Sequence, residues 1–267
     1  MGADIKQLRT RIKSVDSTLH LTKAMGLVAS SKIRRATASM QQGREYAAAV
    51  VDTVAQLTAS AECAGSPYLA NRGEERTRLL VIAGDRGLAG GYNANIFRLM
   101  RDHTDARVYP IGKRSCDRYG GDIRYAEGFS YEDAKALAEE LCRDFADGLY
   151  DRLGIVYTRY ISMMSQEASV EWILPLCAKE GVTQTSAIFE PDEITVLNTV
   201  IPEYVAGILL ARVKESFASE VAARRVAMDS AGKNAQEMID ELGLAYNRAR
   251  QGAITQEITE IVAGSGA

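Results

Sequence analysis

Histidine and cysteine, the residues that most often do chemistry in proteins, are scarce in this 267-residue chain. It has two histidines, His20 and His103, which are far apart in the sequence. The four cysteines form no Cys-x-x-Cys pair: Cys63, Cys116, Cys142 and Cys177. No Ser–His–Asp set, Cys–His set or metal-ligand cluster is visible. We therefore expect no metal, no cofactor and no intrinsic catalysis, and we interpret the cysteines as buried or half-buried free thiols in a reducing compartment.

Long hydrophobic runs are also missing. The longest nearly unbroken apolar stretch, residues 204–211, is far too short to span a bilayer. The start, MGADIKQLRTR, lacks the apolar core of a secretory signal, and Lys6 stands where a myristoylation signal needs Ser or Thr. The sequence thus predicts no membrane anchor of its own.

Negative charge is nearly absent from the first 44 residues. They hold nine Lys or Arg against two Asp, a net charge of +7, which leaves −10 for the rest of a chain whose total is −3. A basic arm on an acidic protein predicts an acidic partner for the arm. Nucleic acid, anionic lipid and an acidic protein surface all fit this charge.

Proline is absent before Pro67, and no proline follows Pro202. From Ile5 onward, apolar residues recur at heptad spacing up to Leu57, with Thr22, Gly26 and Gly43 as the exceptions. A heptad kept for about 53 residues predicts one continuous helix of roughly 80 Å.

The C-terminal part has a similar pattern. Pro202 suits the first turn of a helix, which we expect to continue to Val262. Its predicted apolar seam is Met228, Ala231, Ala235, Met238, Leu242, Ala245, Ala249 and Gly252, shifting afterwards to Ile254, Ile258 and Ile261. Two long helices with narrow seams, one at each end of the chain, are most simply paired as an antiparallel coiled coil. Two amphipathic helices folded over an ordinary core are the alternative.

Between them, strands and helices alternate. Apolar segments at 78–84, 107–112, 122–126, 153–161 and 170–176 are typical of strands, and those at 93–100 and 131–149 of helices. This order predicts an inserted Rossmann-like α/β domain. The expected organisation is an N-terminal coiled-coil helix (1–59), a linker (60–75), the α/β domain (76–190) and a C-terminal helix with its lead-in (191–267).

The glycine-rich segment GDRGLAGG, residues 84–91, lies between a predicted strand and a predicted helix, where α/β proteins often bind phosphate. Its spacing, G-x-x-G-x-x-G-G, matches neither the dinucleotide fingerprint nor the P-loop, and no Lys follows it. We interpret it as a tight turn for close backbone packing.

Three segments resemble one family in the correct order. The stretch IKQLRTRIKSVDSTLHLTKAMGLVASSKIRRA is similar to the N-terminal helix of the gamma subunit of F-type ATP synthase. The stretch ASEVAARRVAMDSAGKNAQEMIDELGLAYNRARQGAITQEITEIVAG is similar to the C-terminal signature of that family, and DRGLAGGYNANIF to its central DRGLCGGLN segment. Together these segments cover about half of the chain.

The resemblance implies a non-catalytic rotor shaft, present once per complex. It implies that the coiled coil stands inside a ring of three alpha and three beta subunits, while the α/β domain meets the epsilon subunit and the membrane c-ring. Proton flow would turn the shaft and drive ATP synthesis at the beta sites. Such a chain would be a peripheral protein on the cytoplasmic face of the bacterial inner membrane, held there only through the complex.

The resemblance also assigns residues. It links Met25 to coupling efficiency and places six residues in all at contacts with beta: Met25, Arg224, Arg250, Gln251, Thr255 and Glu257. We further expect Lys32, Arg34 and Arg35 to face an acidic beta surface. Gly26, where the family usually carries a larger residue, would be offset by tighter packing against Ala245 or Ala249.

Two other functions fit parts of the pattern. One is a dinucleotide-binding enzyme with helical dimerisation arms. The other is a nucleic-acid-binding coiled coil, against which stands the scarcity of aromatic residues for stacking in the basic arm. The coupling ion, the c-ring count, the direction of work and regulation by epsilon are not encoded in a pattern we can interpret.

Overall fold

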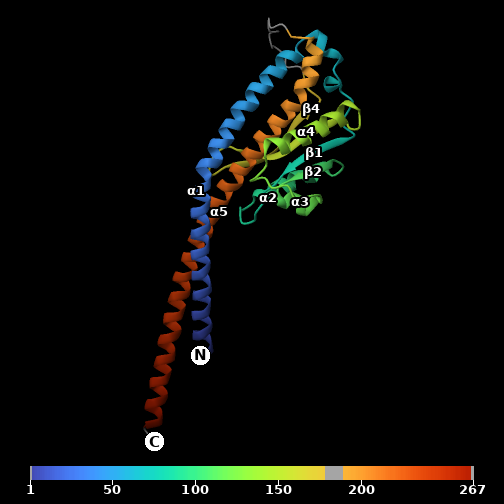
Figure 1. Cartoon of the computed structure of the whole chain (residues 1–267). Helices are drawn as coiled ribbons and strands as arrows, with labels where there is room; N and C mark the ends of the chain where they lie inside the picture. Colours follow the sequence, from blue (N-terminus) through green and yellow to red (C-terminus); the bar gives the residue numbers. More distant parts are fainter. Residues whose placement is uncertain (1, 178–188, 266–267) are drawn as a thin grey trace. The chain divides into compact units, whose positions relative to one another are not determined.

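The computed structural model describes residues 2–177 and 189–265 (Figure 1). Its contacts divide the chain into two compact units, Met1–Ser30 with Arg225–Ala267, and Ser31–Arg224. Two long helices, α1 (Gly2–Thr58) and α5 (Glu193–Ser265), contribute to both units. The structure therefore has the expected fold class, a pair of long terminal helices with an inserted α/β domain. The proposed domain boundaries stay a prediction.

The predicted heptad of α1 is its buried face. Leu19, Thr22, Ala29, Ala36 and Met40 are buried, whereas most residues between them are exposed. The Thr22 hydroxyl, the polar exception in the seam, donates to the Leu19 carbonyl oxygen at 2.9 Å. The polar group is thus satisfied within the helix and does not interrupt the packing.

The helix α5 begins nine residues earlier than predicted. The Asp192 carboxylate accepts hydrogen bonds from the Thr195 N–H (2.8 Å) and hydroxyl (2.9 Å), which is typical of an N-cap. Pro202 therefore lies inside α5 and does not start it. The interpretation of Pro202 as a first-turn residue was wrong, because the capping aspartate is the stronger start signal.

The predicted seam of α5 is partly out of register. Met228, Ala235, Leu242 and Ala249 face inward as predicted, and so do Ile239, Tyr246 and Ala253. The predicted positions Met238, Ala245 and Gly252 are exposed instead. The steps alternate four and three from Met228, not three and four, so every second position moves by one residue.

Close contacts in each unit show that α1 and α5 run antiparallel. In the first unit, a Cβ built on Gly26 would lie 3.7 Å from Met228 Cβ, and one built on Gly232 would lie 3.6 Å from the Thr22 hydroxyl oxygen. Gly26 therefore faces Arg225 and Met228, not Ala245 or Ala249 as expected. The small residues do allow α1 and α5 to approach closely. The residues of α5 that meet Gly26, however, lie about twenty positions before the ones expected.

Replacing Gly26 with alanine is expected to stabilise the chain by about 0.5–1 kcal/mol, since glycine is unfavourable inside a helix. The nearest obstacle, Arg225 Nη1 at 3.1 Å, is the end of a flexible side chain. Gly43→Ala is the matched control, because its Cβ would meet the Ala211 backbone at 3.3 Å, and we expect no gain there. Urea unfolding of the full chain measures both variants, and a loss of stability in Gly26→Ala would contradict the packing described.

The inserted domain contains a four-stranded sheet in the order β2-β1-β3-β4. Its strands are β1 (Thr77–Ile82), β2 (Arg107–Ile111), β3 (Arg152–Tyr160) and β4 (Gln166–Leu174). Strand β1 pairs parallel with β2 and β3, and β4 pairs antiparallel with β3. The central strands are buried on both faces, which explains why their sequences are continuous apolar runs.

Alternate residues of the central strands pack into different cores. Leu80, Ile82 and Ile155 belong to a large core shared with α4 (Tyr131–Ala146), α1 and α5. On the opposite face, Leu79 and Val81 pack with α2 (Tyr92–Leu99) and the short helix η3 (Met100–His103). The long helices are thus part of the hydrophobic core of the second unit and do not merely adjoin it.

The segment 122–126 is not a strand, contrary to prediction. Its residues follow α3 (Lys113–Tyr119), a helix the sequence analysis missed. The Arg124 carbonyl oxygen accepts from the Gly112 N–H at 2.7 Å, and the Ala126 N–H donates to the Asp85 carboxylate at 2.9 Å. The backbone polar groups of this segment are therefore satisfied by a turn and a side chain.

The linker and the cysteines are mostly buried. Within the linker lie two short 3₁₀ helices, η1 (Ala61–Gly65) and η2 (Pro67–Leu69), whose Cys63 and Tyr68 pack into the large core. Cys116 and Cys142 are buried free thiols, as predicted, but Cys177 is exposed. By length and composition alone, one stretch of α5 with a mean hydropathy of 1.6 could cross a membrane; half of it is buried within the chain, as in the core helix of a folded domain.

Candidate functional site

A stripe of polar residues on α5 is buried in the second unit. Most other residues of the helix there are apolar. The stripe occupies positions one helical turn apart, two of them adjacent pairs: Arg212, Glu215 and Ser216, Ser219 and Glu220, and Arg224. Ser216 and Ser219 bond to Thr158 of β3, through its N–H (3.2 Å) and its carbonyl oxygen (3.0 Å). The stripe therefore attaches α5 to the sheet by directional contacts in addition to apolar ones.

The glycine-rich turn packs directly on this stripe. A Cβ on Gly84 would lie 2.8 Å from Glu220 Cδ, so only glycine allows the approach. The Gly84 N–H donates to Asn93 Oδ1 at 2.8 Å, and the Arg86 N–H donates to Glu220 at 3.4 Å. Two backbone donors of the turn thus bond side chains of the same chain, and the turn has the packing role that its spacing predicts.

Asp85 fixes the rest of the turn. Its carboxylate accepts from the backbone N–H groups of Lys113 (3.1 Å), Ala126 (2.9 Å) and Glu127 (2.9 Å). These donors lie at the start of α3 and in the segment that precedes α4, both at the carboxyl ends of β1 and β2. This side chain therefore joins three loops at one edge of the sheet.

Arg224 closes the contact from the α5 side. Its guanidinium pairs with the Glu220 carboxylate and donates to the Gly87 carbonyl oxygen at 3.3 Å. The Glu220 side chain is only 2% exposed and that of Arg224 is 12% exposed. Burial raises the pKa of the Glu220 carboxyl above its ordinary value, and the Arg224 charge opposes that rise. Arg224, predicted from the resemblance to contact a partner, thus has an intramolecular role, and its partner contact stays a prediction.

Glu215 lies at the centre of a second cluster. Its carboxylate accepts from Arg44 of α1 at 2.7 Å, from the Tyr160 N–H of β3 at 3.1 Å and from Arg212 of α5 at 3.2 Å. Arg212 also forms a bidentate pair with Glu171 of β4. Burial alone would lower the pKa of Arg212, but the hydrogen bond and charge of Glu171 raise it. The pairing with Glu171 therefore offsets the cost of burying the Arg212 guanidinium.

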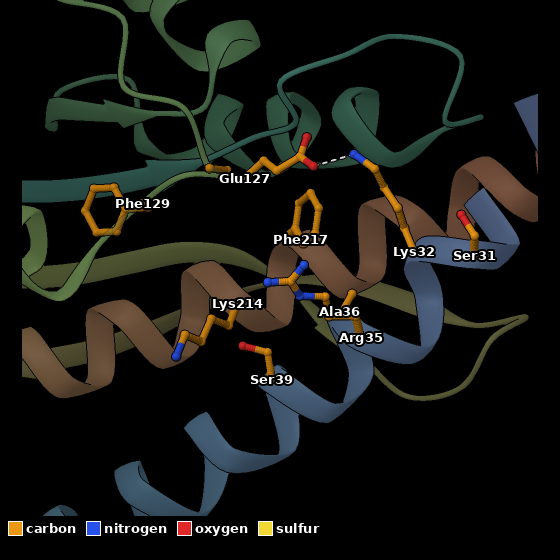
Figure 2. Close-up of a pocket in the computed structure, with 10 residues that line it drawn as sticks. Ser31, Lys32, Arg35, Ala36, Ser39, Glu127, Phe129, Lys214 and Phe217 are labelled. Atoms are coloured by element: carbon orange, nitrogen blue, oxygen red, sulfur yellow. Dashed lines mark hydrogen bonds and ion pairs between the residues drawn. The ribbon is translucent and has the colours of Figure 1, made fainter. Parts of the chain in front are cut away.

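The predicted basic residues of α1 lie beside a groove of about 490 Å³ in the second unit. Arg35 lines it together with Phe129 and Phe217, and Figure 2 shows Lys32 reaching Glu127 while the Lys214 amine points away from that pair. Arg34 is exposed. Lys32 already has a carboxylate partner within the chain, so Arg34 and Arg35 are the more accessible cations.

Met25 lies among exposed apolar side chains of α1. It is half-buried, whereas Leu21, Leu27 and Val28 are 58%, 69% and 53% exposed. Leu21, Met25 and Val28 follow the spacing of one helix face. An exposed apolar face of this kind is typical of an interaction surface.

The last predicted residues are all on the surface of α5. Arg250, Gln251, Thr255 and Glu257 are exposed. The apolar residues among and beyond them are exposed too: Ile254, Ile258, Ile261 and Val262, between 45% and 65%. The expected packing of this terminal stretch against the start of α1 is therefore wrong beyond Ala253, and its side chains are accessible to a partner.

Sequence reasoning missed Arg44, Glu215 and Glu220. Glu215 and Glu220 are carboxylates in an apolar part of α5, and their spacing with Arg212 and Ser216 was a usable signal of a buried polar stripe. Arg44 carried no such signal, since the sequence shows it only as the last of the nine basic residues of the arm. Among the residues that the structure describes, no group of three or more His, Cys, Asp or Glu side chains could hold a metal ion.

Comparison with known proteins gives one consistent result. A family model described as ATP synthase matches residues 4–267. The ATP synthase gamma chain of Ruminococcus albus is 40% identical, with 98% of each chain aligned. The ATP synthase gamma chain of Acetobacterium woodii, described as sodium ion specific, is 35% identical over 100% of this chain and 99% of that protein.

Solved structures agree on the fold. A chain in the cryo-EM structure of the Euglena gracilis mitochondrial ATP synthase, described as OSCP/F1/c-ring, matches with a TM-score of 0.69 at 20% identity. The match covers 100% of this chain and 95% of that one. A central stalk/c-ring structure from Tetrahymena thermophila matches with a TM-score of 0.62 at 24% identity, covering 79% of this chain and 99% of that one.

Proposed function

Because the chain belongs to the family of ATP synthase gamma chains, non-catalytic subunits of the central stalk, we propose that it transmits torque between a membrane c-ring and the catalytic sites of the complex. The single observation that carries the proposal is that both long helices expose large apolar side chains within the first unit. Leu21 and Val28 of α1 and Ile258 and Ile261 of α5 are each more than half exposed. Exposed apolar side chains that recur along a helix face mark a site of interaction with a partner.

The proposed mechanism depends on asymmetry. A single rod inside a ring of three alpha and three beta subunits cannot contact three identical beta subunits in identical ways. Each rotational position therefore favours closure of one site and opening of another, by differential contact energy. The coiled coil supplies stiffness, and the chain itself contributes no catalytic group.

Different observations support the two sets of residues that we expect to contact the beta subunits. Met25, Arg250, Gln251, Thr255 and Glu257 lie on accessible helix surfaces, which favours contact. In the basic arm, Arg34 and Arg35 would meet an acidic beta surface first. Exposed ion pairs give modest attraction without locking the geometry, which suits a surface that must slip.

The remaining partners follow from the same proposal. The α/β domain would meet an epsilon subunit and the c-ring, and the chain would be peripheral on the cytoplasmic face of a bacterial inner membrane. Protons are the coupling ion we propose. The sodium-specific relative from Acetobacterium woodii makes Na⁺ the alternative.

Co-expression with alpha and beta subunits tests the central claim. The chain should copurify in a stable hexamer-containing complex, and ATP hydrolysis by that complex should depend on it. In inverted vesicles of the whole enzyme, ATP should drive acidification that a protonophore abolishes and that needs no Na⁺. ATP-driven ²²Na⁺ uptake that survives the protonophore would instead identify Na⁺ as the coupling ion. Failure of the chain to assemble with alpha and beta subunits would contradict the proposed function.

Replacing Met25 with serine is expected to lower the number of ions moved per ATP hydrolysed, because the side chain would lose apolar contact with a partner. The stability of the chain should change little, since Met25 is only half-buried in it. The exposed neighbour Ala24 supplies the control Ala24→Ser. Equal coupling ratios in the two variants would show that Met25 has no part in coupling.

A further inference from the structure

One carboxylate connects both long helices to the sheet. Glu215, whose side chain is 2% exposed, bonds to Arg44 of α1, to the Tyr160 N–H of β3 and to Arg212 within α5. Arg44 Nη2 additionally donates to the Tyr160 carbonyl oxygen at 2.7 Å. Through Arg212 and Glu171 the same cluster reaches β4 at 2.9 Å. We refer to Arg44, Glu215, Arg212 and Glu171 as the ionic clamp.

The apolar contacts beside the clamp are not directional. Near Tyr160, α1 and α5 meet through Ala36, Met40 and Ala218, and Gly43 faces Ala211. Hydrophobic contact scales with buried area and is indifferent to small displacements along the surface. Side chains as small as alanine and glycine also provide few interlocking ridges. Such an interface resists separation better than it resists sliding.

The clamp resists sliding because its bonds are directional. Charge-assisted hydrogen bonds lose strength steeply when their angle or length changes. The three donors to Glu215 come from two helices and a strand, so displacement of either helix relative to the sheet breaks at least one bond. A carboxylate that lost its donors here would be left buried and uncompensated, which opposes the displacement further.

We propose that Glu215, bonded to Arg44, is the positioning residue that prevents the long helices from slipping against the α/β domain under load. The inference rests on the proposed function, since the load is the torque that the chain transmits. The clamp makes no contact with substrate and has no part in the chemistry. Its effect should appear only when the shaft works against an opposing force.

Glu215→Gln in the assembled enzyme is the test. The variant retains the size of the side chain but removes the charge, which should raise the population of the slipped state roughly tenfold to a hundredfold. Ions pumped per ATP hydrolysed are measured in vesicles while the opposing ion gradient is raised. The variant should match the unaltered chain at zero gradient and lose coupling at gradients that the unaltered chain still supports. A purely structural defect would reduce assembled enzyme or would lower the ratio at every gradient.

Glu167→Gln is the matched control. Glu167 pairs with Arg159 at 2.9 Å across the same two strands, but both side chains are more than half exposed. We expect its coupling to be unchanged at every gradient. Arg44→Gln should also give load-dependent slip. The effect of the double variant should be smaller than the sum of the two single effects, because both single variants remove the Arg44–Glu215 pair.

The outcomes separate this inference from the proposed function. If the unaltered chain assembles and pumps but Glu215→Gln and Arg44→Gln hold the gradient equally well, the clamp inference is wrong and the function stands. If the unaltered chain does not support pumping at all, the proposed function itself fails. Should Glu215→Gln not assemble, Arg44→Gln decides alone, since it leaves the Arg212 and Tyr160 bonds to Glu215 in place.

Discussion

Replacing Gly112 with alanine should prevent the α/β domain from folding. Gly112 has φ of 87°, and a Cβ there would lie 1.9 Å from the Ala83 carbonyl oxygen and 2.8 Å from its carbon. Both obstacles are backbone atoms at the end of β1, so no side chain can move aside. We expect a loss of about 4 kcal/mol or more in the free energy of unfolding, the range in which single substitutions unfold ordinary domains. Urea unfolding and soluble yield of the full chain measure the effect.

Gly120→Ala separates the backbone cost from the clash. Gly120 also has a positive φ, 82°, but nothing lies within 4 Å of its Cβ position. Only the strain of a backbone conformation that is almost confined to glycine remains (φ 82°, ψ 179°), about 1–3 kcal/mol. If the two variants were equally destabilised, the close approach of residue 112 to the end of β1 would not exist as described.

Arg224→Ala is expected to destabilise the chain strongly. It removes the partner of Glu220, whose side chain is 2% exposed, and the donor to the Gly87 carbonyl oxygen. Breaking a buried pair from one side costs about 3–5 kcal/mol. Lys233→Ala is the control, because Lys233 and Asp229 form a pair whose side chains are 73% and 50% exposed; less than about 0.5 kcal/mol is expected there.

The loss of stability caused by Arg224→Ala should become smaller as the pH falls. Burial raises the pKa of Glu220 above its ordinary 4.5, so in the window just above 4.5 the folded chain binds more protons than the unfolded chain. Stability from this group therefore rises as the pH is lowered through the window, and without Arg224 the pKa rises further. The stability difference between Arg224→Ala and the unaltered chain should be smaller near pH 5 than near pH 7.5. If the stability difference did not depend on pH, the Arg224 charge would not be compensating a charge on Glu220.

The two long helices could be predicted because their pattern is redundant. The seam runs from Ile5 to Leu57, almost the whole of the 57-residue α1, so exceptions such as Thr22 do not obscure it. In α5 the frequency of alanine made two neighbouring faces look alike, and the predicted seam drifted by one residue at Met238, Ala245 and Gly252. Alanine and glycine are compatible with the buried seam of a helix pair but also occur outside it, so they do not show which face is buried.

Local interactions explain the errors in the α/β domain. The segment 122–126 has the composition of a strand, but a side chain 41 positions earlier, Asp85, supplies the acceptor for the Ala126 N–H. The residues of the candidate site also fall into two groups, those visible in the sequence pattern and those that depend on distant contacts. The resemblance proposes surface positions such as Met25 and Gln251, whose partner contacts stay a prediction. The Arg44–Glu215 contact spans 171 residues of sequence and depends on the packing of both helices.

The uneven burial of the four thiols has a practical consequence. Cys63, Cys116 and Cys142 are enclosed, and burial raises the pKa of Cys63 and raises that of Cys142 to about 12. Cys177, just beyond β4, is open to solvent. A maleimide-linked fluorophore can therefore be attached to the native chain at Cys177. In a surface-immobilised complex, light microscopy of that label would test whether the chain turns as proposed, with no new attachment point to engineer.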